Sequence, residues 1–103
     1  MQEYEVIVTS QGTVRWYDLK TDLLHREDGP AIEYVNGDKS WFINGKLHRE
    51  DGPALEYASG YKAWYLDDVE YSESEFNAKI NPSSYEGREI EIDGVTYTLK
   101  EKE

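Results

Sequence analysis

The amino-acid sequence predicts a mainly β fold (β-rich α+β), in which stacked antiparallel β-hairpin repeats form a twisted sheet, with one short helix and a C-terminal hairpin as a cap. Three observations support this prediction. An eight-residue string occurs twice, short β-branched and aromatic runs alternate with Gly-containing turns, and one segment has a helix-capping pattern. We expect a single domain over residues 1–103, because this length suits one small core.

The repeated string is Leu-His-Arg-Glu-Asp-Gly-Pro-Ala, here called the octet, at residues 24–31 and again at residues 47–54. The two copies lie 23 residues apart, and the likeness continues into the aromatic segments that follow them. A repeat of this length is typical of arrays in which each unit packs on the next. We therefore predict hairpin repeats over residues 12–71, beginning with a degenerate terminal unit.

The chain then divides into short elements in order. β-branched and aromatic residues predict strands, and Gly, Asn and Asp predict the turns between them. Asn36-Gly37 indicates a two-residue type I′ turn, and Asn44-Gly45 and Asp93-Gly94 indicate further tight turns. The predicted strands lie at residues 4–9, 13–17, 31–34 and 39–43, with the same pattern in the second unit and a C-terminal hairpin at residues 88–99.

A short helix is predicted at residues 72–81. Ser72 and Glu75 have the spacing of a capping box, in which each side chain bonds the other residue's backbone N–H. The helix must end near Asn81, because Pro82 disfavours helical geometry in the residue before it. We expect a loop at residues 83–87 and a frayed end at residues 100–103.

Two aromatic stripes follow from the alternation of side chains along a strand. One stripe is predicted to form the core of the stack, and it consists of Trp16, Trp41 and Trp64. The other is expected on the opposite face, partly packed under the C-terminal elements. Any uncovered part of it is a candidate protein-binding surface, since interfaces are enriched in aromatic residues. This second stripe consists of Tyr17, Phe42 and Tyr65.

The octets themselves are interpreted as structural. A pattern that recurs once per unit usually serves the contact between units, so we expect each Arg to pair with an acid of the neighbouring unit and each His to pack on an aromatic ring. We predict no catalytic, cofactor-binding or metal-binding residues. The structural repeat positions are His25, Arg26, Gly29, Pro30, Trp41, His48, Arg49, Gly52, Pro53 and Trp64.

The composition excludes several functions. The net charge of −11 disfavours direct binding to nucleic acid or to a membrane, since phosphate groups need a basic surface. The chain has no cysteine and no apolar run long enough to span a membrane, and its acidic N-terminus is unlike a signal peptide, so we expect a cytoplasmic protein. An acidic run without Lys or Arg is a candidate partner-binding ridge, and it contains Asp67, Asp68, Glu70, Glu73 and Glu75.

The octet, with its following Gly turn and Lys-x-Trp-aromatic segment, resembles a repeat of small phage and large-virus proteins that are grouped with MORN-like or antitoxin-like repeats. The resemblance covers roughly residues 12–71. It implies stacked hairpins in an elongated sheet, and a scaffolding or binding role rather than catalysis.

The leading functional hypothesis is a non-enzymatic, phage-encoded inhibitor. It would bind a basic surface on a host protein, such as a nucleic-acid-handling defence effector, in the manner of an anti-CRISPR protein. Two alternatives stay open. One is a sponge for a signalling nucleotide that uses Arg26, Arg49 and the aromatic residues, and the other is an antitoxin or immunity protein of a neighbouring toxin. Exposed strand edges also make a homodimer an option.

Overall fold

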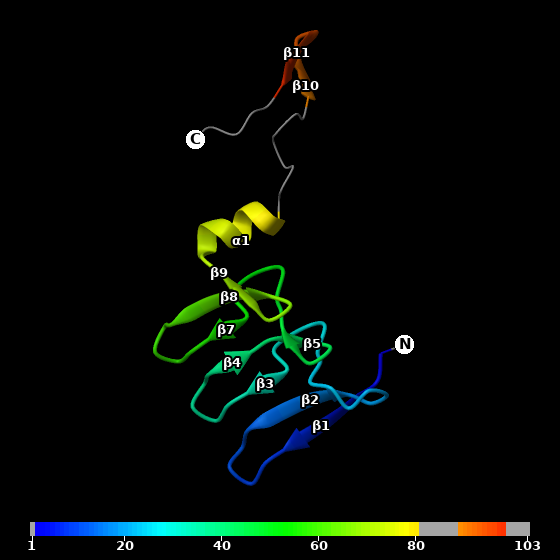
Figure 1. The fold of residues 1–103 in the computed structure, drawn as a ribbon, viewed down its shortest axis with the longest axis vertical. Coiled ribbons are helices and arrows are strands. Elements are labelled where there is room, and N and C mark those ends of the chain that lie inside the picture. The colour runs from blue at the N-terminus through cyan, green and yellow to red at the C-terminus, as the bar shows by residue number, and fades with distance from the viewer. Residues whose placement is uncertain (1, 81–88, 99–103) are drawn as a thin grey trace.

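The structure is a computed structural model that describes residues 2–80 and 89–98. It confirms a mainly β fold, in which antiparallel strands stack along the long axis of the molecule and the described residues include one short helix (Figure 1). Residue 81 and the predicted loop at residues 83–87 lie outside the described residues, as do residues 88 and 99 and the predicted frayed end.

The main sheet has seven strands and only antiparallel neighbours. Its strands, in spatial order, are β1 (Tyr4–Val8), β2 (Val14–Asp18), β3 (Ile32–Glu33), β4 (Lys39–Ser40), β7 (Leu55–Glu56), β8 (Lys62–Leu66) and β9 (Val69–Tyr71). Two smaller sheets are the pair β5 (Phe42–Ile43) and β6 (Lys46–Leu47), and the pair β10 (Glu89–Ile92) and β11 (Val95–Thr98). The predicted strand at residues 39–43 is thus interrupted at Trp41.

Three hairpins, β1–β2, β3–β4 and β7–β8, end in the same kind of tip. In each tip a glycine has φ of 98°, at Gly12, Gly37 and Gly60. In the middle tip the Gly37 N–H donates to the carbonyl of Tyr34, and the Tyr34 N–H donates to the carbonyl of Asp38, each at 2.9 Å. The first hairpin has the same pair of bonds, so its tip has the geometry of the later tips.

The type I′ turn predicted for Asn36-Gly37 is wrong. Only Gly37 has positive φ there, so the connection is a three-residue loop, a type I turn followed by a left-handed glycine. Asn-Gly serves both geometries, because in the longer loop Asn36 accepts a hydrogen bond from the Asp38 N–H at 3.0 Å.

Three other reversals of the chain are two-residue turns, in which both central residues have positive φ. Asn44 and Gly45 have φ of 50° and 80°, as the sequence predicts, and Asp93 and Gly94 have φ of 53° and 79°. The reversal between β8 and β9 has the same geometry with two aspartates, since Asp67 and Asp68 have φ of 48° and 69°.

The core of the stack consists mostly of small side chains. Ala31 and Ala54 are fully buried, and Ile32, Ala63 and Phe76 are nearly so. The backbone at Ala31 bonds on both sides, to Ser40 at 2.8 Å and to Trp16 at 2.7 Å, which leaves little room beside its side chain. The predicted tryptophan core is therefore wrong, because Trp16, Trp41 and Trp64 are all only half-buried.

The helix α1 (Glu73–Ile80) confirms the prediction from the capping pattern. The Ser72 N–H donates to Glu75 Oε1 at 2.9 Å, and the Glu75 N–H donates to Ser72 Oγ at 3.2 Å. The helix packs against β8 and β9 and buries Phe76, so it closes this end of the sheet. The hairpin β10–β11 lies beyond α1 in Figure 1, and the covering of the last repeat comes from the helix. This helix is too short and polar to cross a membrane, and the described residues include no other.

Candidate functional site

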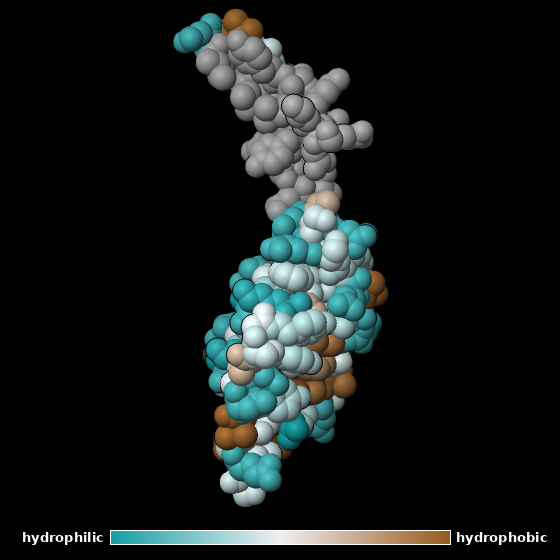
Figure 2. All heavy atoms as spheres, turned by 90° about the vertical axis from the view of Figure 1, so that its left-hand side faces the viewer, coloured by the Kyte–Doolittle hydropathy of each residue, from teal (hydrophilic) through white to brown (hydrophobic). Residues whose placement is uncertain are grey.

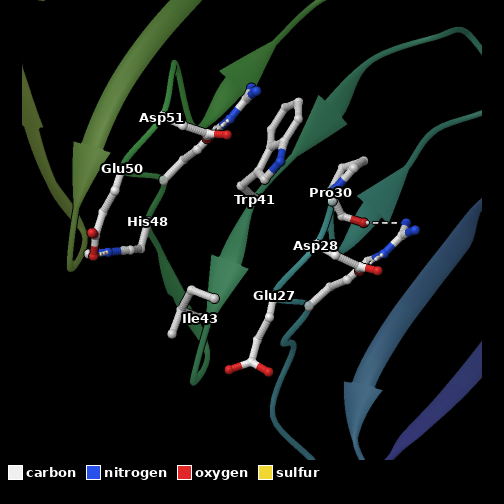
Figure 3. A pocket seen from close by; sticks show the side chains of 11 residues that line it. Glu27, Asp28, Pro30, Trp41, Ile43, His48, Glu50 and Asp51 are labelled. Carbon is white, nitrogen blue, oxygen red and sulfur yellow. Dashed lines mark hydrogen bonds and ion pairs between the residues drawn. The ribbon is translucent and has the colours of Figure 1, made fainter. Parts of the chain in front are cut away.

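A hollow of about 700 Å³ lies between the two octets. Figure 3 shows the octet loops on either side of it, with Trp41 and Ile43 between them. The octets contribute most of its lining, which consists of Arg26, Glu27, Asp28, Gly29, Pro30, Trp41, Ile43, His48, Arg49, Glu50 and Asp51.

The guanidinium group of Arg26 is fixed by four contacts. It lies over the ring of Trp16, with Cζ 3.9 Å from the ring centroid. Its Nε donates to Asp28 Oδ1 at 3.1 Å, and its Nη1 donates to the Pro30 carbonyl at 3.2 Å and to Glu33 Oε1 at 3.3 Å. The side chain keeps only 19% of its exposure, so most of its donors face protein acceptors.

Arg49 repeats this arrangement in the second octet. Its Cζ lies 3.9 Å from the centroid of the Trp41 ring. Its Nε donates to Asp51 Oδ1 at 2.7 Å, and its Nη1 donates to the Pro53 carbonyl at 3.1 Å and to Glu56 Oε2 at 3.2 Å. This bond from Arg49, with the nearby positive charge, holds the pKa of Asp51 below its ordinary value.

The expected pairing of each Arg with an acid of the neighbouring unit is therefore wrong. The carboxylates come from the same octet and the strand after it, and the contact to the preceding hairpin is made through a Trp ring. The octet glycines permit this geometry, because a Cβ at Gly29 would lie 2.9 Å from Cζ of Arg26, and one at Gly52 would lie 3.0 Å from Cζ of Arg49. Glycine is needed here for close approach rather than for positive φ.

Backbone hydrogen bonds join each octet to the hairpins on both sides. The His25 N–H donates to the carbonyl of Trp16 in β2 at 3.0 Å, and the Arg26 N–H donates to the carbonyl of Phe42 in β5 at 3.1 Å. The second octet has the same two bonds, from His48 to Trp41 at 3.0 Å and from Arg49 to Tyr65 at 3.2 Å. The octet is thus the connection between successive hairpins.

His25 is buried and bonds through one ring nitrogen. Its Nδ1 accepts a hydrogen bond from the Asn44 N–H at 2.9 Å, which leaves the proton of the neutral ring on Nε2. The Nε2 atom has no hydrogen-bond partner, and its nearest carboxylate oxygen, on Glu27, is 3.9 Å away. The ring stacks on Tyr4 with centroids 6.3 Å apart, which agrees with the expected packing of His on an aromatic.

His48 has the same backbone contact and more polar surroundings. Its Nδ1 accepts a hydrogen bond from the Asp67 N–H at 3.1 Å, and its Nε2 lies 2.9 Å from Glu50 Oε2. The Asp67 carboxylate is also close, 3.3 Å from Nδ1. Each imidazole therefore accepts a hydrogen bond from the turn of the following hairpin. The two histidines have different hydrogen-bond partners.

Much of the predicted acidic ridge has a structural explanation. Asp67 and Asp68 form the β8–β9 turn, and Asp68 exchanges hydrogen bonds with the backbone of Leu47, accepting at 2.7 Å and donating at 2.9 Å. Glu75 caps α1, and its hydrogen bonds with Ser72 lower its pKa. All five acids are nevertheless exposed, including Glu70 and Glu73.

The second aromatic stripe is partly covered. Tyr17, Phe42 and Tyr65 are all half-buried, and Tyr65 lies opposite Glu70 in the β8–β9 pair. Burial, followed by the negative charge of Glu70, raises the pKa of the Tyr65 hydroxyl. The side chains of this stripe are less exposed than the four acidic side chains at the rim of the hollow, Glu27, Asp28, Glu50 and Asp51.

Sequence reasoning did not identify the hollow, and it gave the acids of the octets, Glu27, Asp28, Glu50 and Asp51, a structural role. The signal was present, because these acids recur at the same place in both octets. Among residues 2–80 and 89–98, no group of three or more His, Cys, Asp or Glu is placed to hold a metal ion. Comparisons with protein-family models, curated proteins and solved structures find no match for this chain.

Proposed function

We propose that this chain is a non-enzymatic protein-binding module that accepts a basic segment of a partner in the hollow between its octets. One observation carries the proposal. Both guanidinium groups at the hollow are already engaged, while the rim carboxylates of Glu27, Asp28, Glu50 and Asp51 keep 62%, 80%, 72% and 85% of their side-chain exposure. The rim is therefore negative, and Trp41 and Ile43 add apolar side chains to the lining of the hollow.

The partner that fits this chemistry presents Lys or Arg side chains on a surface that normally contacts nucleic acid. The net charge of −11 would speed the encounter with such a surface. By covering it, the chain would inhibit a nucleic-acid-handling protein, such as a defence effector of a phage host.

The geometry gives less support to the nucleotide sponge. A phosphate would need guanidinium donors that point to solvent, but Arg26 and Arg49 each hold two carboxylates and one carbonyl. These bonds use three of the five N–H groups of each guanidinium, and a bound phosphate would also meet the four acids of the rim.

A labelled peptide rich in Lys and Arg is a direct probe of the hollow. We expect Glu27→Gln with Glu50→Gln to weaken peptide binding severalfold in a fluorescence titration, and added salt to weaken it further. The matched control is Glu70→Gln with Glu73→Gln, which removes the same charge from the ridge beside α1. Equal losses in both double variants, or binding that is insensitive to salt, would contradict docking at the hollow.

A further inference from the structure

The two ends of the main sheet differ in how they are covered. At one end β9 is short and α1 packs against it. At the other end β1 has five residues, and none of the described strands pairs with its outer edge. Val6, Ile7 and Val8 of β1 are 43%, 44% and 63% exposed. Figure 2 agrees with this asymmetry, because hydrophobic side chains gather at the height of β1 to β4 and the region of α1 is mostly hydrophilic.

The free edge of β1 can be identified residue by residue. The Thr9 N–H donates to Thr13, and the Leu19 N–H donates to Glu3, so the odd-numbered residues of this segment are the ones that bond β2. Hydrogen bonding alternates along an antiparallel strand. The backbone N–H and C=O groups of Tyr4, Val6 and Val8 therefore point outward.

We propose that two copies of this chain pair antiparallel through β1, with Val6 on the twofold axis. In this register Tyr4 of each copy faces Val8 of the other, and Val6 faces Val6, so every outward backbone group of β1 is bonded. A shift of the axis by one residue would leave some of these groups unpaired. It would also bring Glu5 or Ile7 of the two copies face to face.

The same register keeps the two Glu5 carboxylates apart. Glu5 lies opposite Ile7 of the second copy rather than opposite its own counterpart. Ile7 pairs with Arg15 in β2, so Glu5 of one copy and Arg15 of the other lie on one sheet face, two strand spacings or about 10 Å apart. Opposite charges at this distance attract weakly and partly offset the repulsion between two acidic chains. This inference is independent of the proposed hollow.

Single cysteines give a sharp test, because the chain contains none. The hydrogen-bonded pair Val6–Val6 would have Cα atoms about 5.5 Å apart, within the range of a disulfide. Two Val8 residues would be about 14 Å apart along the paired strands. We expect Val6→Cys to oxidise to a covalent dimer on a non-reducing gel and Val8→Cys to stay monomeric. Equal cross-linking of both, or of neither, would overturn the proposal.

Sedimentation of the full chain is the second measurement. We expect a concentration-dependent dimer that persists or strengthens in salt, because salt screens the repulsion between the acidic chains. Binding at the acidic hollow would respond to salt in the opposite direction. Val6→Lys should abolish the dimer by placing two cations on the axis, and Val69→Lys at the other edge of the sheet should leave it intact. A wild-type chain that is monomeric at every concentration, or a dimer lost only in Val69→Lys, would contradict the pairing.

Discussion

The two octets have the same residues, but only part of their structure is the same. In both copies the guanidinium group lies 3.9 Å from the centroid of a Trp ring and bonds an Asp, a Glu and a Pro carbonyl. The histidines differ, because the side chain of His25 is 6% exposed with an unpartnered Nε2, whereas that of His48 is 16% exposed and lies beside two carboxylates.

The neighbouring hairpins cause this difference. Tyr4 of β1, which has no carboxylate, stacks on His25. The turn that bonds His25 contains Asn44. The turn that bonds His48 carries Asp67 at the equivalent place. The octet therefore determines the arginine site. The histidine site also depends on the surrounding units, which supply Tyr4 beside His25 and Asp67 beside His48, while Glu50 of the octet itself lies closer to its histidine than Glu27 does.

The largest expected effect comes from removing the arginines. Arg26→Ala and Arg49→Ala should each lower the free energy of unfolding by about 2–3 kcal/mol, since each loses a stacked ring and several charge-assisted hydrogen bonds. Because the two sites have the same contacts, the two losses should agree within about 0.5 kcal/mol. Urea unfolding followed by circular dichroism measures both. A negligible loss at either site would break the equivalence of the octets.

The histidines should separate the two copies. His25→Ala is expected to cost about 2 kcal/mol, because it removes a buried ring and leaves the Asn44 N–H without its part-buried acceptor, and His48→Ala about 1 kcal/mol at its more exposed site. His25→Asn, which can return an acceptor near the Nδ1 position, serves as the control and should recover part of the loss. If His48→Ala cost more than His25→Ala, burial would not be the deciding difference.

The smallest expected effect is on pH dependence. The Arg49 hydrogen bond lowers the pKa of Asp51 in the folded state, so its contribution to stability is present above the unfolded pKa of about 4 and is lost as the pH falls through the folded value. Asp51→Asn should therefore reduce stability at neutral pH and flatten its decline in acid. Unfolding curves at a series of acidic pH values test this, and an unchanged slope would show that the Asp51–Arg49 bond does not contribute.

The sequence predicted strands, turns and the helix well where a short residue pattern is compatible with a single backbone geometry. The period of the octet indicated stacked hairpins, and Ser72 with Glu75 indicated the start of α1. Asn36-Gly37 was misassigned because the same dipeptide suits a two-residue turn and a three-residue loop, and only the strand register distinguishes them.

The contacts within each octet could not be predicted from the sequence, because they depend on the three-dimensional path of the chain. Alternation along a strand predicted Trp41 in the core, and it did not indicate that the guanidinium of Arg49 would lie over its ring. The closeness of Gly52 to Arg49 is likewise a property of the loop, although the joint recurrence of Arg, Asp, Gly and Glu at fixed spacing was a signal that they act together.

The central claim is that each octet arginine fastens its own loop to the tryptophan of the preceding hairpin. A double-mutant cycle with Arg49→Ala and Trp41→Leu measures that contact directly, with the remote pair Arg49 and Trp16 as the control cycle. We expect a coupling energy of about 1 kcal/mol for the first pair and none for the second. Additive losses for Arg49 and Trp41 would contradict the claim.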